Sequence, residues 1–173
     1  MQDQEAHRIS KLRRPDLKER AAVLEELARN GSPVLPTYPM LIHDLRYKEL
    51  LIYPPTSSKV EGLSVQLSRL HNVYFSGLYG GSFRGQKFHV SMDFAEYLYL
   101  GGHWTSVLKV DEVDERAFLY GRDISLPSSA LEASRTYLVL GPSADVLGLA
   151  RVDPKRMRLL NLIDKGWYLR RGH

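Results

Sequence analysis

The chain has 173 residues and no cysteine, which excludes disulfide bonds, thiolate zinc sites, iron–sulfur clusters and cysteine nucleophiles. It also has no apolar run close to the ~20 residues that a membrane-spanning helix needs. The first residues are charged and no apolar segment follows them, which is not typical of a secretory signal. These absences predict a cytoplasmic protein without a membrane partner.

The sequence also has none of the common catalytic patterns. The glycine-rich stretch Gly77–Gly85 lacks the Gly-Lys-Ser/Thr ending of a phosphate-binding loop, so we interpret it as a turn between two strands. Ser82 cannot belong to a nucleophile elbow, because Arg84 stands where the closing glycine is needed. The six histidines form no metal-binding pair at helical spacing, and we interpret the acidic residues 111–115 as a solvated loop. We therefore predict a protein that is not an enzyme and that has no cofactor and no metal.

The first half of the chain mixes helical and strand patterns. Pro15–Arg29 is predicted as a helix that begins at a proline and ends at Asn30-Gly31. Its apolar face is predicted from four residues at helical spacing: Leu17, Ala21, Leu24 and Ala28. The other elements predicted here are a hairpin over Met40–Leu45 and Glu49–Tyr53, a helix over Lys59–Leu70, strands over Val73–Phe75 and Lys87–Met92, and a helix to Leu100 opened by an Asp93/Glu96 capping box.

The second half follows Gly101-Gly102, where we place a domain boundary. It contains short apolar runs separated by turn residues, a pattern typical of a small closed or half-closed barrel. The predicted strands are Trp104–Val110, Ala117–Tyr120, Thr136–Leu140, Val146–Val152, Met157–Ile163 and Trp167–Arg170. We therefore predict an α+β protein with an α/β domain over residues 1–101 and a β-barrel domain over residues 102–173.

The charge of the chain is concentrated at its end. The net charge is +4, yet residues 151–173 carry seven lysines and arginines against two aspartates, and residues 102–150 carry four against seven acidic residues. A basic block beside an acidic segment is typical of a polyanion-binding edge. A solvated surface with extra lysine and arginine would give the same count. The charge alone therefore does not decide between a nucleic-acid-binding site and an ordinary solvated surface.

The basic block supplies the candidate binding residues, all of which we predict to contact RNA: Arg151, Lys155, Arg156, Arg158 and Arg170. The first four fall within eight residues around Asp153-Pro154, at a predicted strand–turn–strand junction, where they can reach successive phosphates. Arginine adds a planar fork for bidentate contacts and for stacking. Trp167 and Tyr168 offer aromatic faces for bases, although strand alternation should bury one of them.

Three stretches resemble a known family. They are Lys87-Phe88 running to Asp93-x-x-Glu96-Tyr97-Leu98, the motif Phe118-Leu119-Tyr120-Gly121, and Asp153-Pro154 followed by Asp164-x-Gly166-x-Tyr168-x-Arg170. Together they are similar to the nip-seven family of large-ribosomal-subunit biogenesis factors, which carry a pre-PUA domain followed by a PUA domain. The short tail after Arg171 resembles an archaeal-type member.

The resemblance implies a non-catalytic ribosome biogenesis factor for the large subunit, whose PUA half binds uridine-rich single-stranded pre-rRNA through basic residues near the C-terminal strands. It also implies contacts with exosome subunits and other assembly factors. If the source is eukaryotic, it implies a nuclear or nucleolar location. Two alternatives remain open. One is an RNA-modifying enzyme or a subunit of such an enzyme. The other is a non-catalytic protein adaptor or exosome regulator. The adaptor would be favoured if the basic residues were paired internally with Asp153 and Asp164.

Overall fold

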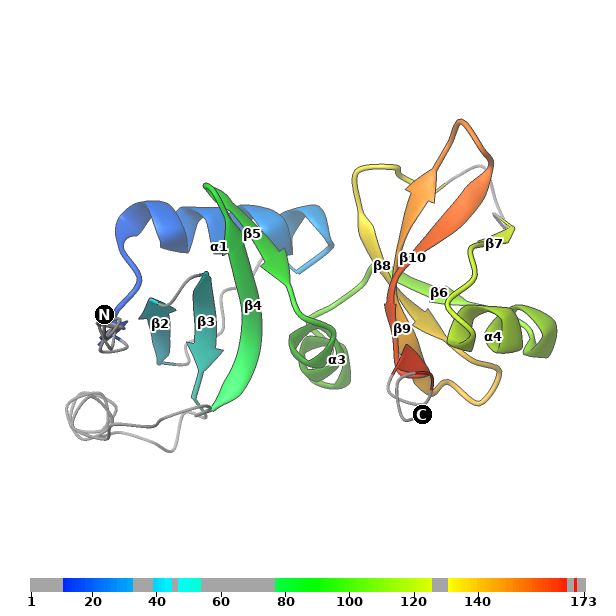
Figure 1. Ribbon diagram of the computed structural model, residues 1–173, viewed down its shortest axis with the longest axis horizontal. Helices are drawn as coiled ribbons and strands as arrows, with labels where there is room; N and C mark the ends of the chain where they lie inside the picture. The colour runs from blue at the N-terminus through cyan, green and yellow to red at the C-terminus, as the bar shows by residue number, and fades with distance from the viewer. Residues whose placement is uncertain are drawn as a thin grey trace, which may run out of the picture. The chain divides into compact units, whose positions relative to one another are not determined.

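The structure is a computed structural model that describes residues 11–32, 39–44, 47–53, 77–125, 131–167 and 170. The chain forms two compact units, one made of residues 1–26 and 35–94 and the other of residues 27–34 and 95–173 (Figure 1). The division falls inside two helices, between Glu26 and Leu27 and between Phe94 and Ala95. The boundary that we predicted after Gly101 therefore differs from it by residues 95–101 and by the short segment 27–34.

The first unit contains a five-stranded antiparallel sheet with strand order β1-β2-β3-β4-β5. The strands are β1 (Lys11–Arg13), β2 (Met40–Asp44), β3 (Lys48–Ile52), β4 (Leu78–Arg84) and β5 (Lys87–Val90), and helix α1 (Leu17–Arg29) follows β1. The predicted hairpin of β2 and β3 is confirmed, with Leu41 opposite Leu51. The predicted helix Lys59–Leu70 and strand Val73–Phe75 lie outside the described residues.

Helix α1 forms where the sequence predicts it, but it buries a different face. Leu17 is 87% exposed and Leu24 is 38% exposed, while Val23 and Leu27 are buried. Glu19 is also buried, because Arg13 binds its carboxylate through two nitrogens at 2.6 and 2.7 Å. The expectation that the stripe beginning at Leu17 faces the core is therefore wrong.

The glycine-rich segment is a strand and not a turn. Its residues form β4, and the turn to β5 lies at Gly85-Gln86. Gly81 is needed in this strand because a Cβ there would lie 2.1 Å from the carbonyl oxygen of His89 on β5. This close approach of two strands, and not a loop, accounts for the glycine.

Helix α3 (Met92–Leu100) has a different cap from the predicted one. The hydroxyl of Ser91 accepts the backbone N–H of Phe94 at 3.1 Å, so Ser91 occupies the N-cap position. Asp93 lies in the first turn of the helix, where its negative charge faces the positive end of the helix dipole. The capping box of Asp93 and Glu96 is therefore wrong, and Glu96 instead forms an ion pair with Lys165 at 2.9 Å.

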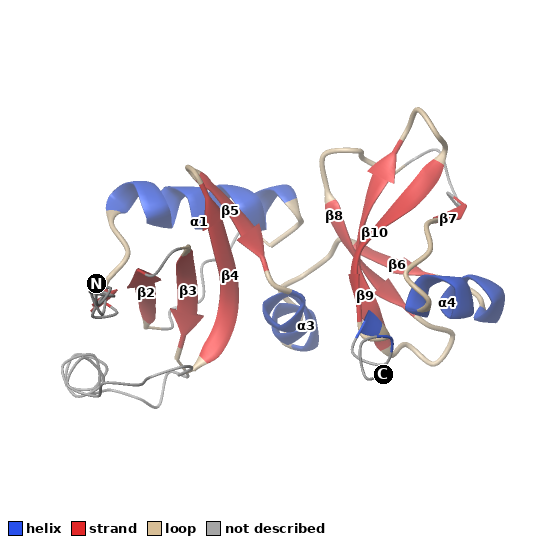
Figure 2. Ribbon diagram, viewed as in Figure 1, coloured by secondary structure: helices blue, strands red, loops and turns tan. Residues whose placement is uncertain are grey.

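The second unit contains a five-stranded sheet, curled into a half-barrel, with strand order β6-β8-β9-β10-β7 (Figure 2). The strands are β6 (Val107–Lys109), β7 (Ile124–Ser125), β8 (Thr136–Leu140), β9 (Val146–Asp153) and β10 (Arg158–Asp164). Strands β6 and β8 pair in parallel, while the pairs β8–β9, β9–β10 and β10–β7 are antiparallel. The core of the half-barrel includes Phe118, Val139 and Leu159, all with no exposed surface. The predicted α+β architecture is confirmed.

Two predicted strands of this unit are helical. Residues 112–119 form helix α4 (Glu112–Leu119), because the Asp111 carboxylate caps it by accepting the N–H groups of Val113 and Asp114, each at 2.9 Å. The strand at Ala117–Tyr120 and the solvated loop at 111–115 are therefore both wrong. Trp167 and Arg170 also have helical conformation, so β10 is the last strand of the described chain.

Within the described part of the chain, no helix is both long and apolar enough to cross a membrane. The same residues contain no cluster of histidine and acidic side chains suited to hold a metal ion.

Candidate nucleic-acid interface

The hairpin of β9 and β10 positions the basic block. Val152 lies opposite Leu159 in the register of the two strands, and both side chains are buried in the core. Because successive side chains of a strand point to opposite faces, Arg151 and Arg158 point away from that core. The buried pair thus determines which side of the hairpin carries the cations.

A four-residue turn joins the two strands and is held by one carboxylate. The Asp153 Oδ1 atom accepts the backbone N–H of Lys155 at 3.0 Å and that of Arg156 at 3.2 Å. Pro154 restricts the backbone at the start of this turn. Met157 ends the turn with a φ of 50°, a left-handed conformation that is uncommon outside glycine, asparagine and aspartate. The turn therefore presents its side chains from a well-defined backbone.

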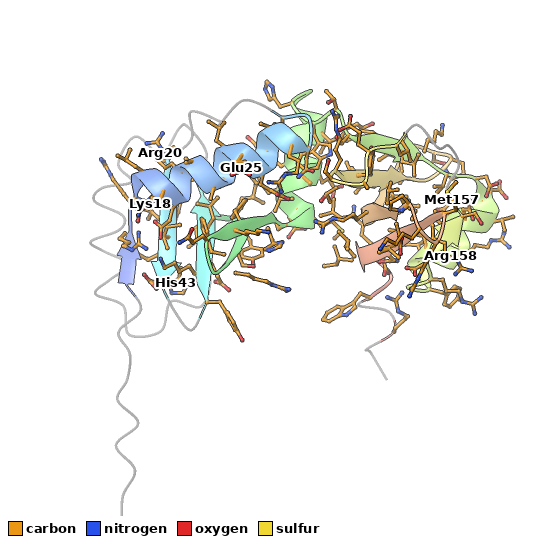
Figure 3. All side chains as sticks on the ribbon, turned by 90° about the horizontal axis from the view of Figure 1, so that it is seen from above. Lys18, Arg20, Glu25, His43, Met157 and Arg158 are labelled. Carbon is orange, nitrogen blue, oxygen red and sulfur yellow. The ribbon has the colours of Figure 1, made fainter. Side chains whose placement is uncertain are left out.

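The cations of the turn are accessible. Lys155, Arg156 and Arg158 are all exposed. The Nε atom of Arg156 lies 3.8 Å from Asp153 Oδ2, and 74% of the Arg156 side chain is exposed, so this contact leaves the guanidinium available. Among the described residues, neither Lys155 nor Arg158 has a carboxylate within ion-pair distance. Figure 3 shows Arg158 and Met157 at the surface of their unit.

Arg151 occupies a different environment beside the turn. Its side chain is half-buried on β9, and its Nη2 atom lies 3.5 Å from the hydroxyl oxygen of Thr136 on β8, a weak contact. Its Nε atom is buried and has no hydrogen-bond acceptor in the described structure. A partly buried guanidinium with an unused donor is suited to bind a phosphate or a carbonyl oxygen.

Arg170 differs from the other four predicted residues because an acidic residue already binds its guanidinium. Its two terminal nitrogens each donate to one oxygen of Asp164 at 2.9 Å, and Asp164 is 2% exposed. The hydrogen bonds to this carboxylate raise the pKa of Arg170. Nη1 of Arg170 also donates to the carbonyl oxygen of Leu119 at the end of α4. The structure therefore brings four of the five predicted residues together on one hairpin and places Arg170 in an internal ion pair.

Several residues that sequence reasoning assigned only to a motif have a visible structural role around this ion pair. Gly166 lies so close to α4 that a Cβ there would be 2.0 Å from the Leu119 carbonyl oxygen. Gly121 has a φ of +76°, and a Cβ there would be 2.9 Å from Nη2 of Arg170. The Asn161 side chain, which the sequence did not single out, donates to the carbonyl oxygen of Phe118 at 2.7 Å.

The two predicted aromatic contacts have different outcomes. Trp167 is 39% exposed, so part of its ring is at the surface. Tyr168 lies outside the described residues. Among the described residues, Trp167 is the surface aromatic closest in sequence to Arg170.

The second unit therefore combines a curled sheet, a helix capped by Asp111 and an exposed basic hairpin. Residues 106–173 match the UPF0113 PUA domain family. A UPF0113 protein from Aeropyrum pernix is 34% identical over 131 residues, which cover 73% of this chain and 71% of that relative. The chain belongs to the UPF0113 family.

A solved structure shows the same fold. It is the crystal structure of a hypothetical protein from the hyperthermophilic archaeon Pyrococcus horikoshii OT3, with a TM-score of 0.53 and 12% sequence identity, and the alignment covers 91% of this chain and 98% of that one. At this identity the likeness concerns the fold alone. The family match supports the resemblance found in the sequence, and a PUA domain indicates RNA binding.

Proposed function

We propose that the protein is a ribosome biogenesis factor that binds uridine-rich single-stranded pre-rRNA through the β9–β10 hairpin. Phosphates are bound by four cations of this hairpin: Arg151, Lys155, Arg156 and Arg158. Arg170 is left out of this set, because Asp164 already binds its guanidinium through two hydrogen bonds.

The observation that carries the proposal is the accessible charge of the turn. Lys155, Arg156 and Arg158 are exposed on a backbone that Asp153 holds in place, and the partly buried Arg151 lies beside them on β9. A single strand bound by this set would displace condensed counterions as each phosphate is neutralised. The expected affinity therefore falls with salt, with a slope of about −2 to −3 in log K against log salt for three or four contacts.

The test is a salt-titrated binding measurement on the full chain, with uridine-rich and adenine-rich single-stranded RNA of equal length. We expect tighter binding to the uridine-rich strand. The double variant Lys155→Ala/Arg156→Ala should lower the salt slope by about 1.4, since two phosphate contacts are lost. Adding Arg151→Ala and Arg158→Ala should remove most of the remaining salt dependence.

The first unit provides a matched control. Arg84 and Lys87 lie opposite one another beside the turn of the β4–β5 hairpin, and both are exposed. The variant Arg84→Ala/Lys87→Ala removes the same charge from another β-hairpin and should leave the salt slope unchanged. Equal losses for the two double variants would show that net charge, and not the β9–β10 hairpin, governs binding.

The remaining parts of the proposal concern the context of this binding. We propose a non-catalytic role in the cytoplasm of an archaeal-type cell, with residues 1–101 serving as a pre-PUA domain for protein contacts. Exosome subunits and other large-subunit assembly factors are the partners that the family resemblance suggests. The adaptor alternative has two observations in its favour, the internal ion pair of Arg170 with Asp164 and the longer, exposed contact of Arg156 with Asp153. It would replace the RNA proposal if the chain bound neither RNA at low salt.

A further inference from the structure

Helix α1 carries an apolar stripe on its exposed side. The stripe consists of Leu17, Ala21, Leu24 and Ala28, which the structure places at the surface. The other side of the helix is buried through Val23 and Leu27, so the two apolar faces are separate. A contiguous apolar stripe in water is a candidate interaction surface.

The spacing of the stripe indicates what kind of surface fits it. The steps between its four residues are four, three and four, which is the spacing of core positions in a coiled coil. Leucine and alanine alternate along it. In an antiparallel pair of such helices, Leu17 would face Ala28 of the partner subunit and Ala21 would face Leu24 of the partner subunit, so that a large residue always meets a small one.

The charges beside the stripe fit a second copy of the same helix. Lys18 follows Leu17 and Glu25 follows Leu24, so the two charged residues are seven apart and flank the stripe on one side. Figure 3 shows both along α1. In the antiparallel pairing just described, Lys18 would lie beside Glu25 of the partner subunit, and two-fold symmetry would repeat the contact. Within the described residues, Lys18 has no ion-pair partner of its own.

We propose that α1 is a homodimerisation surface, on which the stripe packs against the same stripe of a second copy in antiparallel orientation. The proposal concerns assembly and is independent of RNA binding, since its residues lie on α1 and the cations on the β9–β10 hairpin. A helix of 13 residues is about 20 Å long. An interface of this length is small, and we expect a weak dimer with a dissociation constant between about 10 µM and about 1 mM.

The first test is sedimentation equilibrium of the full chain from micromolar to millimolar concentration. Wild type should shift from monomer to dimer, and Leu24→Lys should raise the dissociation constant at least about tenfold, because it places a charge in the apolar contact. Leu100→Lys is the matched control, since Leu100 is an exposed helical leucine (76%) on α3, and it should leave the dissociation constant unchanged. Circular dichroism should show equal helix content in all three proteins.

The second test reverses the charges. Lys18→Glu and Glu25→Lys should each weaken the dimer, because like charges then meet at both symmetric contacts. A mixture of the two variants should form a mixed dimer, since position 18 of one copy and position 25 of the other again carry opposite charges. The double reversal in one chain should restore the wild-type dissociation constant.

These outcomes decide the proposal. The homodimer proposal is overturned if the wild-type protein stays monomeric at about 1 mM. A dimer that Leu24→Lys leaves intact also overturns it, because another surface would then hold it. A dimer that responds to Leu24→Lys but not to charge reversal would overturn the antiparallel arrangement.

Discussion

Arg170 and Asp164 form a bidentate ion pair, with both nitrogen–oxygen distances at 2.9 Å, and Asp164 is almost fully buried. The same guanidinium donates to the carbonyl oxygen of Leu119, at the negative end of the α4 dipole. One side chain thus connects the end of β10 to the end of α4. This relationship explains why the motif around Phe118 and the motif around Asp164 occur together in the sequence.

Replacing Arg170 should destabilise the fold of the second unit. Arg170→Ala leaves a buried carboxylate and a helix-end carbonyl without their donor, and both are unfavourable. Arg170→Lys should recover only part of the loss, because an ammonium cannot bind both carboxylate oxygens in the same way. Urea unfolding would measure the change in the free energy of unfolding. Arg156→Ala is the exposed control, and its free energy of unfolding should lie within about 0.5 kcal/mol of wild type. Equal stability of Arg170→Ala and wild type would contradict this role.

Acid should destabilise the first unit through Glu19. Hydrogen bonds from Arg13 lower the pKa of Glu19 to about 2, from an ordinary value of 4.5, and Lys48 adds an ion pair at 2.9 Å. Since the folded pKa is the lower one, the stabilisation is complete above pH 4.5 and is lost as the pH falls toward 2. It amounts to at most about 3 kcal/mol.

The variant Glu19→Gln tests this contribution directly. It should lower the free energy of unfolding at pH 7 by about 2 kcal/mol, since Arg13 and Lys48 lose their common anion. Its stability should also change less than that of wild type between pH 5 and pH 2, a range set by the two pKa values of Glu19. An unchanged pH profile would mean that other carboxylates dominate acid unfolding.

The protein should be more stable with glycine than with methionine at position 157, in the turn of the basic hairpin. Met157 is 54% exposed and has a positive φ, so its side chain contributes little packing and its backbone is strained. Met157→Gly removes the strain of the left-handed backbone, which raises the free energy of unfolding. The greater freedom of glycine in the unfolded chain offsets part of this gain, so we expect a net increase of up to about 1 kcal/mol. Thermal unfolding of Met157→Gly and Met157→Ala should be compared. Both variants lose the methionine side chain, but only glycine removes the backbone strain, so the difference between them measures the strain. A glycine variant less stable than the alanine variant would contradict the prediction.

Gly166 should accept no side chain. A Cβ at this position would lie 2.0 Å from the Leu119 carbonyl oxygen, which is backbone and cannot rotate away. Gly166→Ala should therefore lower the free energy of unfolding by about 2 kcal/mol or more. Gly101→Ala is the control, because a Cβ there first meets the His103 ring at 3.3 Å, and it should change stability by less than about 0.5 kcal/mol. Equal effects of the two substitutions would show that the second unit can shift to relieve the contact.

Local patterns predicted much of the secondary structure. The strands β8, β9 and β10 and helix α1 lie close to their predicted positions, because continuous apolar runs, turn residues and a helix stop signal are local features. The basic hairpin was predicted for the same reason, since four cations around Asp153-Pro154 are visible in the sequence. Helix α4 was missed, because the Asp111 cap outweighs the short apolar run at Ala117–Tyr120.

The sequence by itself determined the positions of α1 and of the strands β2, β3, β8, β9 and β10, the concentration of positive charge after residue 150 and the absence of cysteine chemistry. Only the tertiary structure decided which face of α1 is buried, because Glu19 can enter the interior only where Arg13 reaches it from β1. It also decided the role of each cation. Charge counts treat Arg158 and Arg170 alike, but the folded chain brings a buried carboxylate to Arg170 and leaves Arg158 exposed. The physical reason is that burial and ion pairing depend on contacts between residues distant in sequence, which no local pattern contains.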